Sequence, residues 1–388
     1  MNSNKQILFA LMMVACSQVA QAAEWSLTST LNPSATYDDN VFLRENAQSS
    51  THYAMSPTIT GSRTVENSDI SLSLGYQIDR YTSLPSINDT ENPFIRLNSY
   101  YNAERSQYGL SASYVESTSR STALLETGDF ATQSIYRSRT ISPSYSYQLT
   151  ERDSLSLNGS YSERLSSSTQ LSDTETKSIS AGWQRQLSER LSAGVTAAIY
   201  NYKSDGLTLL TDDDDYNLST TFNYALSELW NISGAVGLRK LKGQRKSVTI
   251  GITTNDNSSG TTLDFSAIRT DDINSYSITA SRALIPTGRG DVNQNDSLSV
   301  SWAHHISDQL TANLVGSYYQ STSAIDNSNN KRKNINISPS LRWQLERNLS
   351  LNVNYTYRKQ TQDSGFSADS NAIGVTLNYN WDGIRISR

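Results

Sequence analysis

The chain has 388 residues and a formal net charge of −5, from 32 Lys and Arg against 37 Asp and Glu. This acidic balance argues against nucleic acid as the main partner, and a single cysteine rules out an intramolecular disulfide. Hydrophobic residues make up only 36% of the chain, but 22 Tyr and 6 Trp are too many for a disordered protein.

Residues 1–22 have the layout of a secretory signal peptide. Lys5 precedes the apolar run ILFALMMVA, and Ala20-Gln21-Ala22 forms a small-x-small cleavage site. We therefore expect cleavage between Ala22 and Ala23 and one mature domain over residues 23–388. Cys16 follows MVA and weakly resembles a lipoprotein acylation site, which leaves lipidation as the alternative.

The mature chain alternates apolar and polar residues. In LSLNVNYTY (349–357) the Leu, Val and Tyr residues share one face, and Ser, Asn and Thr share the other. The same pattern occurs in ISLSLGYQI, SLSLNGSYS, SLSVSW, NISPSLRWQL and IGVTLNYNW. A period of two predicts strands that are apolar on one face and polar on the other.

Similar tight turns separate these strands. QLTERDSLSLNGSY (148–161), QLSERLSAGVTAAIY (186–200), HISDQLTANLVGSYY (305–319) and QLERNLSLNVNYTY (344–357) repeat one wording, and a further turn is expected at 271–274. Longer connections lie between successive turns. Tight turns at one end and long loops at the other are typical of a bacterial outer-membrane barrel with periplasmic turns.

We predict an all-β fold, a closed antiparallel transmembrane β-barrel of eighteen strands, with sixteen as the alternative count. A two-sheet sandwich is the alternative fold. The expected strands cover residues 25–37, 52–62, 70–81, 93–104, 108–117, 134–149, 154–164, 176–187, 191–203, 215–226, 230–241, 261–269, 275–285, 296–306, 310–321, 334–345, 349–359 and 370–381.

Aromatic side chains stand near both ends of the predicted strands, on the apolar face. Such rings match the interfacial girdles of a membrane barrel, although the core of a sandwich would also hold aromatics. The candidate interfacial aromatics are Trp183, Trp302, Trp343, Trp381, Tyr161, Tyr318 and Tyr357.

Two stretches carry a family resemblance. PSATYDDNVFL (33–43) and SRALIPTGRGDVNQNDSLSVSW (281–302) resemble segments of a family of β-barrel porins encoded with exopolysaccharide and exosortase systems. The resemblance implies an outer-membrane barrel that takes part in exopolysaccharide export with other export components. The final strand, with Gly374, Tyr379 and Trp381, is similar to the signal that the barrel-assembly machinery recognises, which implies that machinery as a partner.

The sequence offers little for catalysis, and we expect neither an enzyme nor a cofactor. The histidines are His52, His304 and His305, and the last two precede a tight turn, where a polar interfacial role is common. TDDDDY (211–216) is expected in an outer loop, as a solvated acidic stretch or a collector of divalent cations. It lacks the ligand spacing and the glycine of a dedicated calcium loop.

Two basic stretches, RKLKGQRK (239–246) and KRK (331–333), lie at or beyond predicted outer strand ends. They are either ordinary loop charges or contacts for the head groups of outer-membrane lipid and lipopolysaccharide. The longest outer connection, roughly 241–260, could fold inward as a constriction. Alternatively, SVTIGI (247–252) extends a hairpin above the membrane.

The polar face is mostly neutral, with hydroxyl and amide side chains that exchange hydrogen bonds with sugars. We therefore expect an outer-membrane channel, first of all a conduit for exopolysaccharide, with a general porin for small solutes or an adhesive surface barrel as alternatives. The candidate lumen-lining residues are Ser156, Asn158, Ser160, Ser299, Ser301, Ser338, Ser340, Arg342, Gln344, Asn352 and Asn354.

Overall fold

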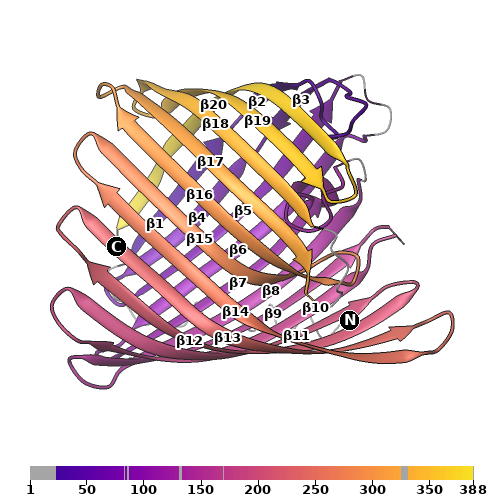
Figure 1. Ribbon diagram of the computed structural model, residues 1–388. Helices are drawn as coiled ribbons and strands as arrows, with labels where there is room; N and C mark the ends of the chain where they lie inside the picture. The colour runs from indigo at the N-terminus through magenta and orange to yellow at the C-terminus, as the bar shows by residue number, and fades with distance from the viewer. Residues whose placement is uncertain are drawn as a thin grey trace, which may run out of the picture.

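The computed structural model describes residues 23–82, 84, 87–130, 133–168, 170–324 and 331–387. They form one antiparallel sheet that closes on itself as a barrel (Figure 1). The predicted signal peptide, with Cys16 and Ala22, lies outside the described residues, and Ala23 is the first residue among them.

Strands make up nearly all of the regular structure, together with one short helix, α2 (Ser119–Thr122). Among the described residues, none of the helical structure is long and apolar enough to cross a membrane. The strands are β1 (Glu24–Leu31), β2 (Ser34–Asp38), β3 (Ser50–Met55), β4 (Thr58–Val65), β5 (Ser68–Tyr81), β6 (Thr90–Asn102), β7 (Ser106–Thr118), β8 (Ile135–Gln148), β9 (Asp153–Ser166), β10 (Asp173–Gln186), β11 (Leu191–Asp205), β12 (Leu209–Ala225), β13 (Trp230–Ser247), β14 (Thr253–Thr270), β15 (Asn274–Pro286), β16 (Val292–His305), β17 (Leu310–Ser323), β18 (Arg332–Glu346), β19 (Leu349–Gln362) and β20 (Ser367–Ser387).

Two prolines explain why twenty segments make eighteen barrel strands. Pro33 separates β1 from β2, and Pro57 separates β3 from β4, because proline has no N–H to donate to the ladder. Their carbonyls still accept hydrogen bonds, from Leu377 N at 3.0 Å and from Tyr76 N at 3.2 Å. The strand β1–β2 pairs with β20 and closes the barrel, so the predicted fold and the count of eighteen are confirmed.

The alternation of the sequence separates an inner face, turned into the barrel, from an outer face. On β13 the outer face presents Val236 and Leu238, whose side chains are 59% and 70% exposed. Gly237, which lies between them, and Arg239, which follows Leu238, are buried on the inner face. Large apolar side chains exposed on most strands form a belt around the barrel. Such a belt matches the lipid-facing surface of an outer-membrane protein.

The sequence motif that recurs in the tight turns has a local cause in hydrogen bonding. Thr150, Ser188, Ser227 and Ser307 each accept, on the side-chain oxygen, hydrogen bonds from the backbone N–H groups two and three residues later. Asp271 makes the same turn with its carboxylate, which accepts from Asn274 N at 2.6 Å and Ile273 N at 3.1 Å. These backbone hydrogen bonds lower the pKa of Asp271.

One prediction about the outer end is wrong, because the strand ladder continues past the apolar belt. TDDDDY (211–216) lies within β12, where Asp213 pairs with Gly243 in register, and not in a loop. The stretch 241–260 does not fold inward. Instead β13 and β14 stay paired up to Lys246 and Thr253, which is the alternative of an extended hairpin. This hairpin projects beyond its neighbours at the lower right of Figure 1.

An added positive charge should destabilise the barrel much more on the outer face than on the inner face. Val236→Arg would place a cation in the apolar belt and should lower the free energy of unfolding by about 2–4 kcal/mol. Ala235→Arg is the matched control, because Ala235 faces inward beside its register partner Asp264 and should cost under about 1 kcal/mol. Denaturant unfolding of the protein in lipid vesicles measures both. Equal losses would contradict the assignment of the outer face to lipid.

Candidate functional site at the outer mouth of the barrel

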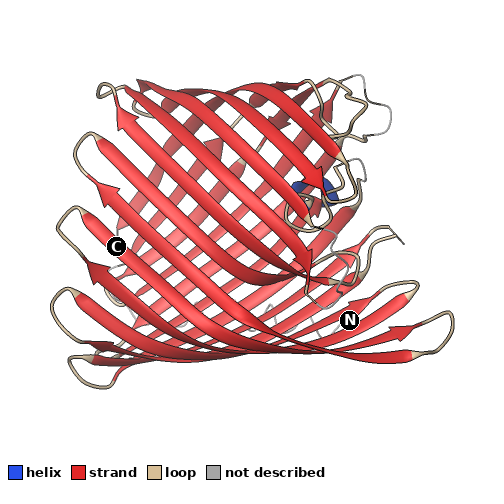
Figure 2. Cartoon of the chain, viewed as in Figure 1, coloured by secondary structure: helices blue, strands red, loops and turns tan. Residues whose placement is uncertain are grey.

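Three connections at the outer end, here called the inward segments, turn back into the barrel. They comprise residues 39–49 after β2, residues 119–130 after β7, and residues 287–291 after β15. The second contains α2, which lies within the outline of the strands at that end of the barrel (Figure 2). The inward segments narrow the outer mouth.

The segment 119–130 is held against the opposite wall by side chains of β16, β18 and β19. Arg332 donates hydrogen bonds to the carbonyl oxygens of Glu126 at 3.2 Å and Leu124 at 3.1 Å. Gln360 donates to the carbonyl oxygen of Gly128 at 3.1 Å, and Asn295 donates to that of Leu125 at 3.0 Å. Long polar side chains of the wall therefore satisfy backbone acceptors that no sheet partner serves.

Gly128 is required where this segment reaches the wall. Its φ angle is +69°, in the left-handed region, and a Cβ at this position would lie 2.5 Å from Cδ of Arg332. Only glycine fits both the conformation and the contact.

Apolar contacts also fix the first two inward segments. Leu43, Ala123, Phe130 and Ala368 form a buried cluster that joins them to β20. Leu43 is only 2% exposed and has a φ of +50°, which is costly for a residue other than glycine. Burial of its side chain in this cluster offsets that backbone strain.

The third inward segment rests on β11 and β12. The Tyr202 hydroxyl donates to the Thr287 carbonyl at 3.0 Å, and the Thr211 hydroxyl donates to the Gly290 carbonyl at 2.9 Å. The Gly288 N–H in turn donates to the Glu126 carboxylate at 3.2 Å. This bond joins the second and third inward segments to each other.

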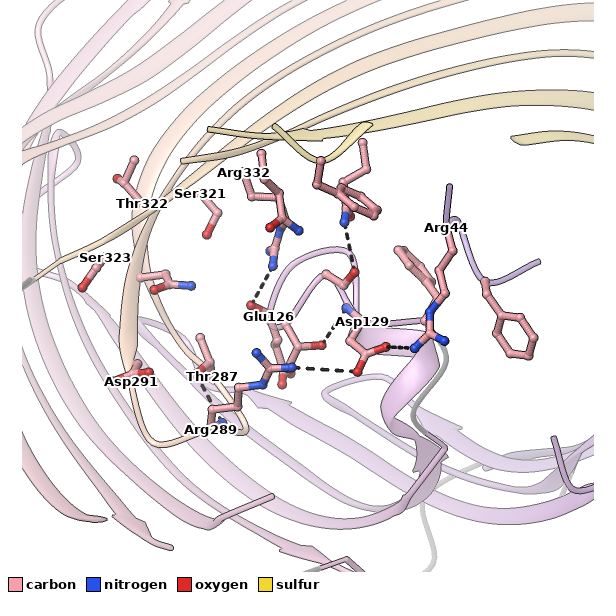
Figure 3. Close-up of a pocket in the computed structure, with 18 of the residues that line it drawn as sticks. Arg44, Glu126, Asp129, Thr287, Arg289, Asp291, Ser321, Thr322, Ser323 and Arg332 are labelled. Atoms are coloured by element: carbon pink, nitrogen blue, oxygen red, sulfur yellow. Dashed lines mark hydrogen bonds and ion pairs between the residues drawn. The ribbon is translucent and has the colours of Figure 1, made fainter. Parts of the chain in front are cut away.

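Between the inward segments and the wall lies a polar cavity of about 460 Å³ (Figure 3). Its lining carries four arginines and three carboxylates, and it also includes Phe42, Phe130 and Phe366. The charged lining residues are Arg44, Arg245, Arg289, Arg332, Glu126, Asp129 and Asp291.

Positive charge is in excess around the cavity. Asp129 lies 3.9 Å from both Arg44 and Arg289, so two guanidinium groups share one carboxylate (Figure 3). Glu126 is already neutralised by Arg164 of β9 at 2.6 Å, and Arg164 is not among the lining residues. The lining of this cavity therefore carries more positive than negative charge, which favours small anions over cations there.

All predicted lumen-lining residues lie on inner faces. They alternate in step with Arg164, Asn295, Arg332 and Gln360, the wall residues that contact the inward segments. The predicted lumen-lining residues are Ser156, Asn158 and Ser160 on β9, Ser299 and Ser301 on β16, Ser338, Ser340, Arg342 and Gln344 on β18, and Asn352 and Asn354 on β19. Their contact with a passing solute stays a prediction.

The predicted interfacial aromatics lie on outer faces, out of step with the same wall residues. Trp183, Trp343, Trp381, Tyr161 and Tyr318 are exposed, whereas Trp302 and Tyr357 are half-buried. Their contact with the membrane interface is likewise a prediction.

The arginines of the cavity were not predicted from the sequence as site residues. The alternation splits both basic stretches: Arg332 faces inward from KRK, and Arg239 and Arg245 face inward from RKLKGQRK. Lys333, Lys240 and Lys246 face outward. Continuing the two-residue period through these stretches would have shown the split. Arg44 and Arg289 lie in irregular segments, where no period applies.

The remaining candidates for chemistry are dispersed. Nε2 of His52 donates a hydrogen bond to the Asp79 carboxylate at 2.8 Å, and the His52 ring stacks on Tyr81. His304 is hydrogen-bonded to Asn274, and His305 to Thr311. The described ranges contain no group of three His, Cys, Asp or Glu that could hold a metal ion. Asp212 and Asp214 face outward, and Asp213 and Asp215 face inward, so the acidic run does not converge on one point.

Comparison with solved structures finds outer-membrane proteins. The siderophore receptor PiuA from Acinetobacter baumannii is similar with a TM-score of 0.55 and 8% identity, over 94% of this chain and 82% of that one. The ferric citrate transporter FecA is similar with a TM-score of 0.50 and 10% identity, over 86% of this chain. The chain spans only 60% of the length of FecA. These likenesses concern the fold, which is that of outer-membrane barrels.

OccK9 (OpdG) from Pseudomonas aeruginosa aligns over 92% of this chain and 98% of its own, with a TM-score of 0.49 and 12% identity. Residues 288–373 match a family model described as "Putative MetA-pathway of phenol degradation". No curated protein sequence matches the chain.

Gly128→Ala tests how the segment 119–130 is held. The new methyl group meets Arg332 and a left-handed backbone, so the segment should loosen at a cost of roughly 1–2 kcal/mol. Trypsin should then cleave the folded barrel faster after Arg120. Gly316→Ala is the control, since a Cβ there meets no atom within 4 Å. Identical cleavage rates for the two variants would refute the proposed hold.

Proposed function

We propose that the chain is a passive channel of the bacterial outer membrane, through which small polar solutes diffuse, with its narrowest part at the inward segments. The observation that carries this proposal is the inner wall. Barrels of sixteen to eighteen strands leave room for an aqueous channel, and the inner wall of this barrel is polar along its strands.

Rows of neutral hydroxyls supply that polarity. Cross-strand hydroxyl pairs on the inner face include Thr140 with Ser162 at 3.0 Å and Ser142 with Ser160 at 3.1 Å. Ser281 and Ser297 make the same contact on another wall, at 2.7 Å. Such groups exchange hydrogen bonds with water and with polar solutes without holding either strongly. Charges gather instead at the outer mouth, where a solute enters.

The cavity at the outer mouth favours a small cargo with an acidic group. Two arginines that share one carboxylate supply attraction for an anion, and Phe42, Phe130 and Phe366 supply apolar contact for a ring. The description of the family that matches residues 288–373 refers to phenol degradation, which is consistent with a small aromatic cargo. We therefore propose small aromatic acids as preferred solutes.

Exopolysaccharide export is the second candidate. The neutral inner wall and the resemblance of residues 33–43 and 281–302 favour it. The inward segments oppose it, because a polymer chain needs a wide path and these segments pack across the outer mouth through polar and apolar contacts. Diffusion of small solutes fits the narrowed mouth better.

Single-channel recording in planar bilayers tests the channel and its cargo together. We expect discrete openings of the mature protein that benzoate blocks more strongly than benzamide, its neutral analogue, because the arginines at the mouth attract the carboxylate. Block by maltohexaose with no effect of benzoate would favour the glycan conduit. An absence of channel currents, with insertion of the protein confirmed, would refute the proposal of an open channel.

The paired variant Arg44→Gln/Arg289→Gln tests the origin of the anion preference. Removing both guanidinium groups leaves Asp129 without its two cationic neighbours, so the permeability ratio of chloride to potassium should fall roughly two- to threefold. Reversal potentials across a salt gradient give this ratio. Arg137→Gln is the control, since Arg137 lies on the outer face beside Glu116 at 3.4 Å and should leave the ratio unchanged.

A further inference from the structure

The basic stretch 239–246 is divided by β13 between the two faces of the barrel. Arg239 and Arg245 face inward, where Arg239 donates to Gln294 at 2.9 Å and Arg245 lies 3.3 Å from Asp291. Lys240, Lys242 and Lys246 face outward and are exposed. These three residues are here called the lysine row.

The lysine row begins where the apolar belt ends. Val236 and Leu238, with 59% and 70% of their side chains exposed, occupy the two outward positions just before Lys240. A transmembrane strand needs about 9–11 residues to cross the hydrocarbon, and Lys240 is the eleventh residue of β13. The lysine row therefore starts at the outer boundary of the hydrocarbon, at the level of lipid head groups.

Four other outward cations at this end have carboxylate partners on the protein, whereas Lys333 and Lys359, on the outer faces of β18 and β19, have none within 4 Å in the described part of the chain. Carboxylates lie close to Lys177, Lys203, Arg139 and Arg282, at 2.6, 3.1, 3.3 and 2.6 Å. Within the described part of the chain, the lysine row has no carboxylate within 4 Å, and only Lys242 has a recorded contact, with the Tyr216 ring at 5.5 Å.

The nearest acidic side chains are already engaged. Asp214 is the register partner of Lys242 on β12, but its carboxylate accepts a hydrogen bond from Asn201 at 2.9 Å. Asp212 accepts from the same amide and pairs with Lys203. Lys240 and Lys242 occupy successive outward positions, about 7 Å apart, so they repel each other, and Gln244 separates them from Lys246. An external anion would relieve this repulsion.

The strand on the other side of the lysine row is polar and neutral. Ser259 and Asn257 of β14 are the register partners of Lys240 and Lys242, and Asn255 follows them. All three are exposed on the outer face. The surface therefore combines cations for phosphate, amide and hydroxyl groups for sugar, and exposed Leu238 below for acyl chains.

We propose that the outer face of β13 and β14 binds the phosphorylated disaccharide of lipopolysaccharide, with the phosphates on the lysine row and the sugar over Asn255, Asn257 and Ser259. Lipid A is the partner whose chemistry matches all three parts of the surface. The extended hairpin above the belt supplies the area for it. This surface lies outside the channel and does not depend on the proposed transport function.

The test measures lipid binding to the detergent-solubilised mature barrel by native mass spectrometry. The probes are diphosphoryl lipid A, the same lipid without phosphates, and phosphatidylglycerol. We expect the wild type to prefer diphosphoryl lipid A over the other two by at least about tenfold. Lys240→Gln/Lys242→Gln/Lys246→Gln should lose at least about tenfold in affinity for it, since each lysine at an anionic lipid surface contributes roughly fivefold.

The matched control is Lys177→Gln/Lys203→Gln, which removes two outward lysines that already have carboxylate partners and should change the affinity by less than about twofold. A channel conductance equal to that of the wild type would show that the triple variant folds. If the wild type gives no openings, an unchanged circular dichroism spectrum would show the same. Undiminished binding by the triple variant, or no preference for the phosphates, would overturn the proposal. Equal binding of phosphatidylglycerol would overturn the assignment to lipopolysaccharide.

Discussion

The structure depends on one constraint: in hydrocarbon, every backbone N–H and C=O needs a partner within the protein. A single sheet meets it only by closing, and here β1 and β2 complete the ladder against β20. Closure gives each strand one face toward lipid and one toward the interior. The two-residue alternation of the sequence follows from these two faces. Leu238 and Arg239 are adjacent in sequence, but Leu238 faces lipid and Arg239 faces the interior of the barrel.

The constraint ends where the hydrocarbon ends, and the outer mouth uses the freedom this leaves. There the backbone departs from the sheet in the inward segments, and side chains take over the role of partner strands. Arg332, Gln360 and Asn295 donate to carbonyls that would otherwise be buried without hydrogen bonds. The surplus of positive charge has two sources: Arg332 and Arg245 on the wall, and Arg44 and Arg289 on the inward segments themselves. Arg332 serves both the anchoring of the segments and the proposed selectivity.

The sequence predicts the part of the molecule within the hydrocarbon better than the part beyond it. All eighteen strands and the turn at Asp271 were predicted, because lipid on one side and water on the other enforce alternation, and tight turns require Ser, Thr or Asp at a fixed place. The inward segments escaped prediction. Contacts such as that of Gly128 with Arg332 join residues 204 positions apart and leave no local pattern. Polarity alone predicts a loop for the acidic run 211–216, but β12 continues through it as a polar strand in water.

The pairing of Glu24 with Ser387 has a consequence for how the protein is made. This last ladder joins the two ends of the described chain, so the barrel cannot close before residues 24–387 are all available for pairing. Contacts of such long range form slowly, because the entropy lost in closing the chain must be recovered by many bonds at once. Until then, the apolar faces of eighteen strands have neither lipid nor neighbours to cover them. Exposed apolar faces and unpaired strand edges promote aggregation, so this topology carries an aggregation risk until the last ladder forms.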